Sequence, residues 1–161
     1  MATLYRVEPF TGIVVFTDDG VLDYQDWEET FLEALADPEV KRPRRFLSDR
    51  RGLTHPISLG TIEQGRQFLE RHSMQLQDVR WAMLSRPDSS LASTAQLIED
   101  FVRPTLIHFR AFTDLTKALR WLFPYYDDDE IAKLGDWVDS GAGGRISHAD
   151  EKQPKDGAHR D

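Results

Sequence analysis

The sequence predicts one α/β domain with a mostly parallel sheet of about five strands and crossover helices. Between residues 44 and 122, a short apolar run, a polar break and an amphipathic helix follow one another three times. Strands that alternate with helices of this length indicate parallel strands joined by crossover helices. The three predicted strand–helix pairs are 44–49 with 58–72, 79–85 with 88–103, and 105–112 with 114–122.

Two further strands are predicted before this repeat, at residues 4–8 and 12–16. The link between them, Pro9-Phe10-Thr11, is short enough for an antiparallel hairpin. The first run alternates polar and apolar residues, which is typical of an edge strand. The second is continuously apolar, which is typical of a buried strand. We therefore expect a sheet that is parallel except at its amino-terminal edge, with right-handed crossovers.

The helix boundaries carry recognisable capping residues. Asp23 is a natural N-cap for a helix that ends at Asp37-Pro38, and Ser58 is one for the next helix. Trp27 and Phe31 share an apolar stripe of the first helix, which predicts core packing, with a ligand-binding wall as the alternative.

Two glycines, Gly60 and Gly65, interrupt the second predicted helix, and each weakens an isolated helix by roughly 1 kcal/mol relative to alanine. Such residues suggest that something approaches the helix closely. We expect that to be the sheet, and a ligand is the alternative.

The carboxyl-terminal part divides into a last helix and a tail. Residues 127–130 are acidic and predict the start of a short helix at 131–138 that packs on the domain. From residue 140 to residue 161, Ile146 is the only large apolar residue, so this segment is expected to be disordered. The predicted domain spans residues 1–139, and the predicted tail spans 140–161.

Composition excludes several classes of function. The 161 residues include no cysteine, so disulfides, thiolate catalysis and zinc–sulfur sites are excluded, and a cytoplasmic location is expected. A net charge of −8 argues against nucleic acid as a partner. The longest aliphatic or aromatic run near the amino terminus is residues 13–16, so no membrane span is expected there. The basic run at residues 41–45 is interpreted as solvated cations after a helix end, with an anion-binding patch as the alternative.

Candidate chemistry is limited to one edge of the predicted sheet. The five histidines lack the spacing of metal ligands, and no nucleophile–base pair is evident, so no metal, cofactor or enzymatic activity is predicted. In open α/β sheets, ligands bind beyond the carboxyl ends of the parallel strands. Arginine, hydroxyl and helix-start groups at that position suit an anion or a phosphorylated side chain. The predicted rim consists of Asp49, Arg50, Arg51, Ser58, Ser85 and Arg86.

A family resemblance adds to this interpretation. The order of elements, the motif FLSDRR at residues 46–51, and Phe112-Thr113-Asp114 with the helix that follows resemble the SpoIIAA-like branch of the STAS superfamily, including STAS/SEC14-like proteins. The resemblance covers about residues 4–122 and implies a non-catalytic regulatory or binding module. Anti-sigma-factor antagonists of this superfamily carry an Asp-Ser-Ser or Asp-Ser-Thr phosphoacceptor at the start of the second helix. This chain has Thr54-His55-Pro56-Ile57-Ser58 there, so only Ser58 or Thr54 could take that role.

Two functions follow. The first is a non-enzymatic regulatory module that binds a protein partner, and a homo-oligomer is left open. The second is a carrier of a small apolar or amphipathic ligand, as the SEC14-like label implies. A cavity on the order of a few hundred Å³ would favour the carrier, and a filled core would favour the module.

Overall fold

The computed structural model describes residues 3–87 and 91–143 and contains one five-stranded mixed sheet. The strands follow the order of the chain, β1-β2-β3-β4-β5, with β1 antiparallel to β2 and every other neighbouring pair parallel. This confirms the predicted α/β class and the antiparallel amino-terminal edge. The strands are β1 Thr3–Val7, β2 Val14–Gly20, β3 Arg45–Leu53, β4 Arg80–Leu84 and β5 His108–Phe112.

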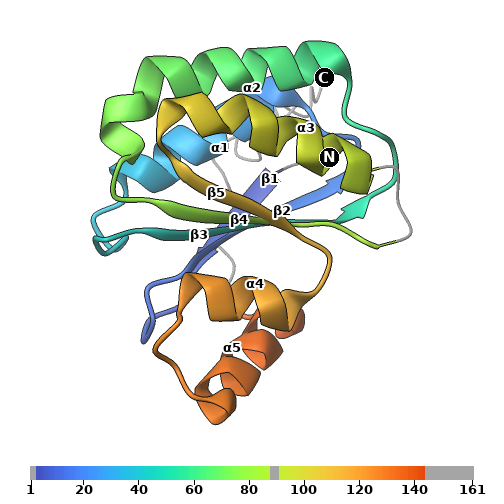
Figure 1. Ribbon diagram of the computed structural model, residues 1–161. Helices are drawn as coiled ribbons and strands as arrows, with labels where there is room; N and C mark the ends of the chain where they lie inside the picture. The colour runs from blue at the N-terminus through green and yellow to red at the C-terminus, as the bar shows by residue number, and fades with distance from the viewer. Residues whose placement is uncertain (1–2, 88–90, 144–161) are drawn as a thin grey trace, which may run out of the picture.

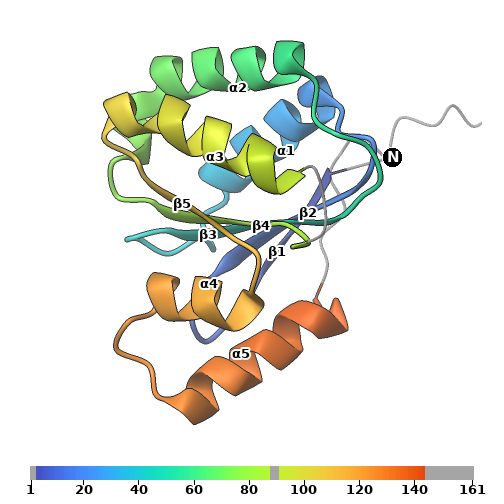
Figure 2. The same cartoon turned by 45° about the vertical axis from the view of Figure 1, so that its right-hand side comes forward.

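The described helices form two layers of different origin (Figure 1, Figure 2). The three crossover helices cover one face of the sheet, since crossovers of one hand that add strands in one direction place their helices on one side. The other face is covered by the two helices that follow β5. The crossover helices are α1 Tyr24–Ala36, α2 Leu59–His72 and α3 Leu91–Val102, and the others are α4 Leu115–Leu122 and α5 Asp128–Ser140.

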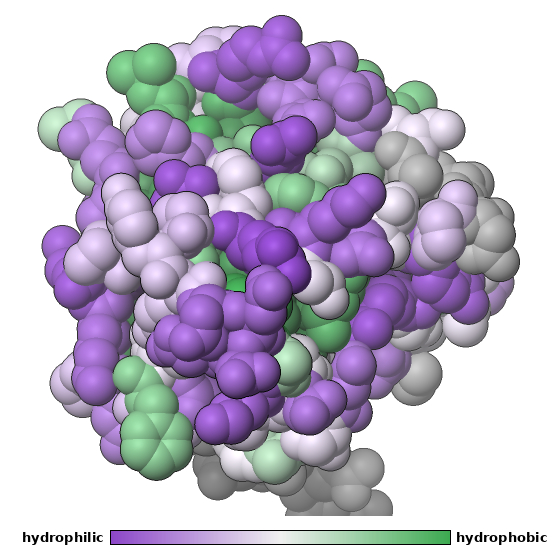
Figure 3. Space-filling view, turned by 60° about the horizontal axis from the view of Figure 1, so that its bottom comes forward, coloured by the Kyte–Doolittle hydropathy of each residue, from purple (hydrophilic) through white to green (hydrophobic). Residues whose placement is uncertain are grey.

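The predicted helix starts agree with the hydrogen bonds. The Asp23 carboxylate accepts a bond of 2.9 Å from the Asp26 amide at the start of α1, and the Ser58 hydroxyl accepts one of 3.1 Å from the Thr61 amide in α2. Asp127 forms a reciprocal capping box with Glu130, so α5 begins at Asp128 rather than at residue 131. The first turn of α5 is acidic and faces solvent, on a side of the molecule that is mainly hydrophilic (Figure 3).

Several other predicted boundaries differ from the structure, and the strand β2 ends at Gly20 rather than at residue 16. The strand β3 continues to Leu53, four residues beyond the predicted end, because Asp19 and Gly20 of β2 extend far enough to pair with it. The strand β5 begins at His108 because the preceding Arg103–Thr105 segment forms a turn of 3-10 helix. The predicted tail includes Ser140, which ends α5, and Gly141, which caps it with a φ of 66°. Residues 144–161 lie outside the described residues.

Each face of the sheet has its own apolar core. On the side of α1–α3, aromatic rings dominate, with Phe31 at their centre, and its centroid lies 5.0–5.6 Å from five other rings. On the side of α4 and α5, the buried residues are mainly aliphatic, such as Leu47 and Leu119. Strand alternation separates the two sets, because Phe46 contributes to the first core and its neighbour Leu47 to the second.

Arginines from the sheet hold the second helix layer in place. Arg80 donates a bond of 2.7 Å to the carbonyl of Trp121 near the end of α4, and its guanidinium carbon lies 4.3 Å from the centre of that residue's ring. Arg6 repeats the arrangement at α5, with a bond of 2.9 Å to the Val138 carbonyl and a distance of 4.6 Å to the Trp137 ring. Cations favour the carboxyl ends of helices, and a guanidinium gains further stabilisation over an indole.

Candidate ligand-binding cavity

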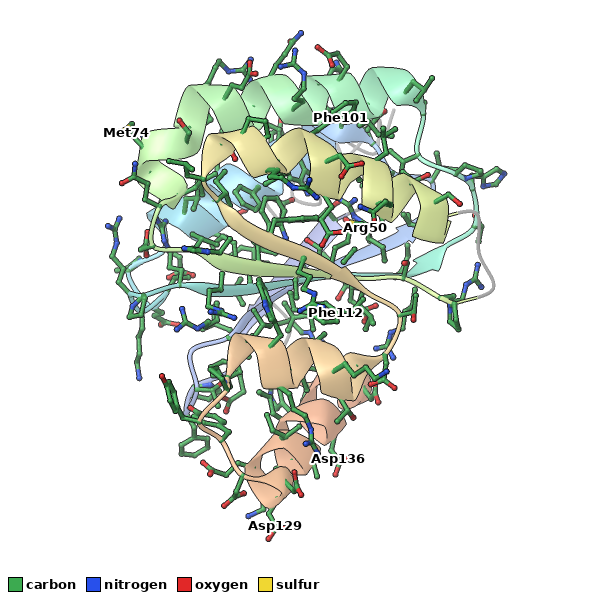
Figure 4. The ribbon with its side chains drawn as sticks, in the orientation of Figure 1. Arg50, Met74, Phe101, Phe112, Asp129 and Asp136 are labelled. Carbon is green, nitrogen blue, oxygen red and sulfur yellow. The ribbon has the colours of Figure 1, made fainter. Side chains whose placement is uncertain are left out.

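An apolar cavity lies between the sheet and the layer formed by α1–α3. Its volume is about 60 Å³, and the whole recess with the open space at its mouth spans about 570 Å³. Phe101 of α3, which is 37% exposed, lies at the side facing α2 (Figure 4). The lining residues come from α1, α2, α3, three strands and two loops: Leu22, Tyr24, Trp27, Arg50, Ile57, Thr61, Ile62, Gly65, Arg66, Leu69, Trp81, Met83, Ile98, Phe101, Val102 and Phe109.

Arg50 is the buried charge in this lining. It projects from β3 toward the face of the sheet that α1–α3 cover, and it is only 7% exposed (Figure 4). Its Nε donates a long bond of 3.3 Å to Asp18 Oδ2, and its Nη1 lies 3.0 Å from the sulfur of Met83, a weak acceptor. Within the described part of the chain, Nη2 makes no hydrogen bond. Since a guanidinium carries five N–H donors, Arg50 keeps unused capacity beside the cavity.

Asp18, the counter-ion of Arg50, is itself almost fully buried. Burial raises the pKa of this carboxyl group, and the charge of Arg50 and the hydrogen bond from the Thr3 hydroxyl, at 2.7 Å, oppose that effect. One carboxylate oxygen of Asp18 accepts the bond from Thr3, and the other accepts only the long bond from Arg50. The pair therefore lacks the close bidentate geometry that is typical of strong Arg–carboxylate pairs. Its partner therefore leaves the guanidinium incompletely satisfied.

Trp27 contributes a second unsatisfied donor. This residue is 4% exposed and packs in the aromatic core, with its ring 5.1 Å from that of Phe31, as core packing predicted. It also lines the cavity, as the alternative of a ligand wall required. Its indole N–H is buried and has no hydrogen-bond partner among the residues that the structure describes. Buried polar groups are normally hydrogen-bonded, so an orphaned N–H beside a cavity is a notable exception.

The glycines of α2 do not have the expected packing role. Apart from the adjacent residues and the backbone of α2 itself, no heavy atom of the described chain lies within 4 Å of a Cβ built on Gly65, and only the Ser58 hydroxyl lies near one on Gly60, at 3.9 Å. The expectation that both glycines allow close packing on the sheet is therefore wrong. Gly65 instead lines the cavity, where a larger side chain would occupy its wall.

The predicted rim does not gather at one place. Arg50 lies on the face of the sheet that α1–α3 cover. Arg51 lies on the opposite face, where it bonds to Asp49 and to Asp139 of α5, at 2.9 and 2.8 Å. The two arginines are separated because successive strand residues point to opposite faces. Arg86 donates to the Leu53 carbonyl at 3.1 Å.

The rim hydroxyls have local roles. Ser58 caps α2, so its oxygen is already engaged by the Thr61 amide. Ser85 is buried, and within residues 3–87 and 91–143 its hydroxyl has no hydrogen-bond partner. The Thr54 hydroxyl lies 2.9 Å from Nδ1 of the neighbouring His55. The structure therefore distributes the predicted site residues over both faces and a helix start, and of these only Arg50 lines the cavity.

The basic run at residues 41–45 is partly used in the fold. Arg44 is buried and bonds to both carboxylate oxygens of Asp78 at 2.8 and 3.1 Å, while Arg45 donates to the Leu122 carbonyl at 2.9 Å. Arg45 thus satisfies a helix carboxyl end, but the helix is α4 rather than the preceding α1, and the expectation of solvated cations is wrong for Arg44, which is buried.

The described residues contain no cluster of three or more histidine, cysteine, aspartate or glutamate side chains that could hold a metal ion. In the same part of the chain, no helix has both the length and the apolar character needed to cross a membrane.

Sequence reasoning missed two features of the cavity. It placed Arg50 in the rim beyond the carboxyl end of its strand, and it did not single out Met83, which lines the cavity beside Arg50. The alternation of Phe46, Ser48 and Arg50 on β3 was the available signal, because it places the arginine on the same face as a buried aromatic residue.

No model of a known protein family matches the chain, and a comparison with curated protein sequences finds no match either.

Proposed function

We propose that the protein is a non-enzymatic binding module that holds a small amphipathic molecule in the cavity between α2, α3 and the sheet. The single observation that carries this proposal is the combination of an apolar lining with the buried cation Arg50, whose Nη2 makes no hydrogen bond among the described residues. An apolar pocket with a few polar groups is the usual form of a small-molecule site.

The size of the cavity restricts the ligand. A volume of about 60 Å³ is well below the roughly 300 Å³ of a drug-sized site. The cavity therefore suits a small molecule, or one end of a longer molecule whose remainder lies in the wider recess. The volume of this cavity is smaller than that expected of a carrier, yet the core is not completely filled as expected of a pure interaction module.

A binding role also suits the chemistry of the lining. Among the described residues around the cavity, no histidine, carboxylate or lysine is present to act as a general base. The order of two strands, a helix and three strand–helix units supports the further proposal of a SpoIIAA-like topology and a regulatory role, in which occupancy of the cavity is the signal.

The test is a titration of the purified protein with 1-octanol, a neutral amphipathic probe, followed by 1H–15N NMR. We expect shifts concentrated on the cavity residues. In a Gly65→Leu variant, the new side chain should fill the cavity wall and abolish these shifts.

The matched control is Gly60→Leu, the same substitution on the same helix at a glycine outside the lining. It should leave binding of the probe intact. Equal shifts in the wild type and Gly65→Leu, or shifts confined to the outer surface, would refute the proposal.

A further inference from the structure

We infer that the ligand of this cavity carries no net charge and presents a carbonyl oxygen to the guanidinium of Arg50. This inference rests on the proposed function and names the chemical class of its ligand, a neutral carbonyl compound with an apolar body. It follows from the charge balance around the cavity and from the kind of polar group that the lining can satisfy.

The charges beside the cavity already balance. Arg50 is 7% exposed and Asp18 is 2% exposed, and the two form an ion pair with 3.3 Å between Nε and Oδ2. Arg66, the other cation of the lining, pairs with Glu63 and Glu70 on its own helix. A charged ligand would therefore bring an uncompensated charge into apolar surroundings, which is costly. A neutral ligand avoids this cost.

The balance of charge does not satisfy every N–H group of Arg50. Its Nε donates to Asp18, its Nη1 lies 3.0 Å from the Met83 sulfur, and its Nη2 has no partner in the described part of the chain. The indole nitrogen of Trp27 is sealed in the core, whereas Nη2 of Arg50 is not among the sealed, unpaired atoms of the described residues. Because Arg50 lines the cavity, a ligand oxygen there can accept a hydrogen bond from it.

The lining offers little to a ligand that must itself donate. Among the described residues around the cavity, no side chain is a carboxylate or an amide. The Thr61 hydroxyl already accepts a bond of 2.9 Å from Ser58, and the Met83 sulfur beside Arg50 is a weak acceptor. An O–H or N–H group of a ligand would lose its hydration with poor compensation. A carbonyl group only accepts, so it matches the donor that Arg50 provides.

The experiment compares three probes of equal chain length, 2-octanone, 1-octanol and octanoate, by isothermal titration calorimetry on the full chain at neutral pH. We expect 2-octanone to bind several-fold more tightly than 1-octanol, whose O–H lacks a good acceptor, and about tenfold more tightly than octanoate, which brings a charge. Octanoate or 1-octanol that binds at least as tightly as 2-octanone would overturn the inference while leaving the proposed function intact. Failure of all three probes would instead refute the proposed function.

Infrared spectroscopy reports on the carbonyl group directly. A carbonyl oxygen that accepts a hydrogen bond from a cation has a weaker C=O bond, and its stretching band lies at lower frequency than in an alkane solvent. With the protein in excess, bound 2-octanone should show this lowered band. A band at the alkane position would place the carbonyl against apolar side chains and contradict the inference.

Two variants assign the effect to Arg50. The double variant Arg50→Met with Asp18→Asn removes both members of the buried pair, so neither charge is left alone. It should weaken 2-octanone about tenfold and return the carbonyl band toward its alkane position. Arg51→Met is the matched control on the opposite face of β3 and should change neither result. Unchanged affinity in the double variant would exclude Arg50 as the donor, and the wild-type infrared band decides if that variant does not fold.

Discussion

Gly52 of β3 lies directly against Asp19 of β2, so that a Cβ on Gly52 would be 1.9 Å from the Asp19 Oδ1 atom and 3.3 Å from the Asp18 carbonyl oxygen. The pairing of β2 with β3 is irregular at this point, between Thr17 and Asp19. A glycine in a strand is typical of an irregular pairing with a close approach, and here the neighbour is identified.

Gly52→Ala is therefore expected to lower the free energy of unfolding by about 1 kcal/mol, because the Asp19 side chain must turn away or the strands must separate. Chemical denaturation measures the change. The double variant with Asp19→Ala should recover most of the loss, whereas an additive result would place the strain in the backbone.

The two serines of the predicted rim should respond oppositely to replacement by alanine. Ser58→Ala removes the N-cap of α2 and should cost about 1 kcal/mol of stability. Ser85→Ala removes a buried hydroxyl that has no partner in the described part of the chain, and it should be neutral or stabilising by up to about 1 kcal/mol. Thermal denaturation of both variants tests the pair, and a large loss in Ser85→Ala would reveal a partner for its hydroxyl.

Asp78 should make stability depend on pH in acid. Although burial acts to raise its pKa, the hydrogen bonds and charge of Arg44 hold the pKa of Asp78 below its usual value. A carboxyl group with a lowered pKa stabilises the fold above its unfolded pKa of about 4 and loses that contribution as the pH falls through the folded value.

Asp78→Asn should consequently reduce stability by roughly 1.5–3 kcal/mol at pH 7, with a difference from wild type that shrinks below pH 4. Urea denaturation from pH 3 to 7 measures it. Asp128→Asn is the control, since Asp128 forms an exposed pair with Arg120 and should have little effect. A constant difference across this range would contradict the assignment.

Arg80→Lys should weaken the attachment of α4 although the charge is kept. Lysine lacks the planar fork that bonds to the Trp121 carbonyl while stacking on its ring, so we expect a loss of about 1–2 kcal/mol. Arg120→Lys, on the exposed side of α4, should change stability by much less. Equal effects of the two substitutions would show that stacking at Trp121 contributes nothing specific.

The order of elements and most capping residues were predictable because they depend on local periodicity. The caps Asp23 and Ser58 act within one turn of chain, and the buried residues of α2 repeat at helical spacing. The end of β3 was not predictable in this way, since it depends on how far β2 extends beside it.

That one boundary decided the outcome for the candidate site. With β3 ending at Asp49, residues Arg50 and Arg51 would belong to one loop and could point the same way. Within a strand that continues to Leu53, they alternate, and Arg50 enters the aromatic side while Arg51 reaches α5. The cavity itself was also beyond sequence reasoning, because its volume results from side chains of three helices and three strands.

The separate cover of the second sheet face by α4 and α5 has a consequence for synthesis on the ribosome. Every strand and all three crossover helices emerge before residue 115, so the growing chain holds an apolar surface that includes Leu47 and Leu84 with nothing yet made to shield it. Until the last two helices leave the exit tunnel, the nascent protein resembles a target for chaperones more than a finished domain. Substitutions that slow the docking of α4 would then reduce the yield of folded protein in the cell by prolonging this exposure.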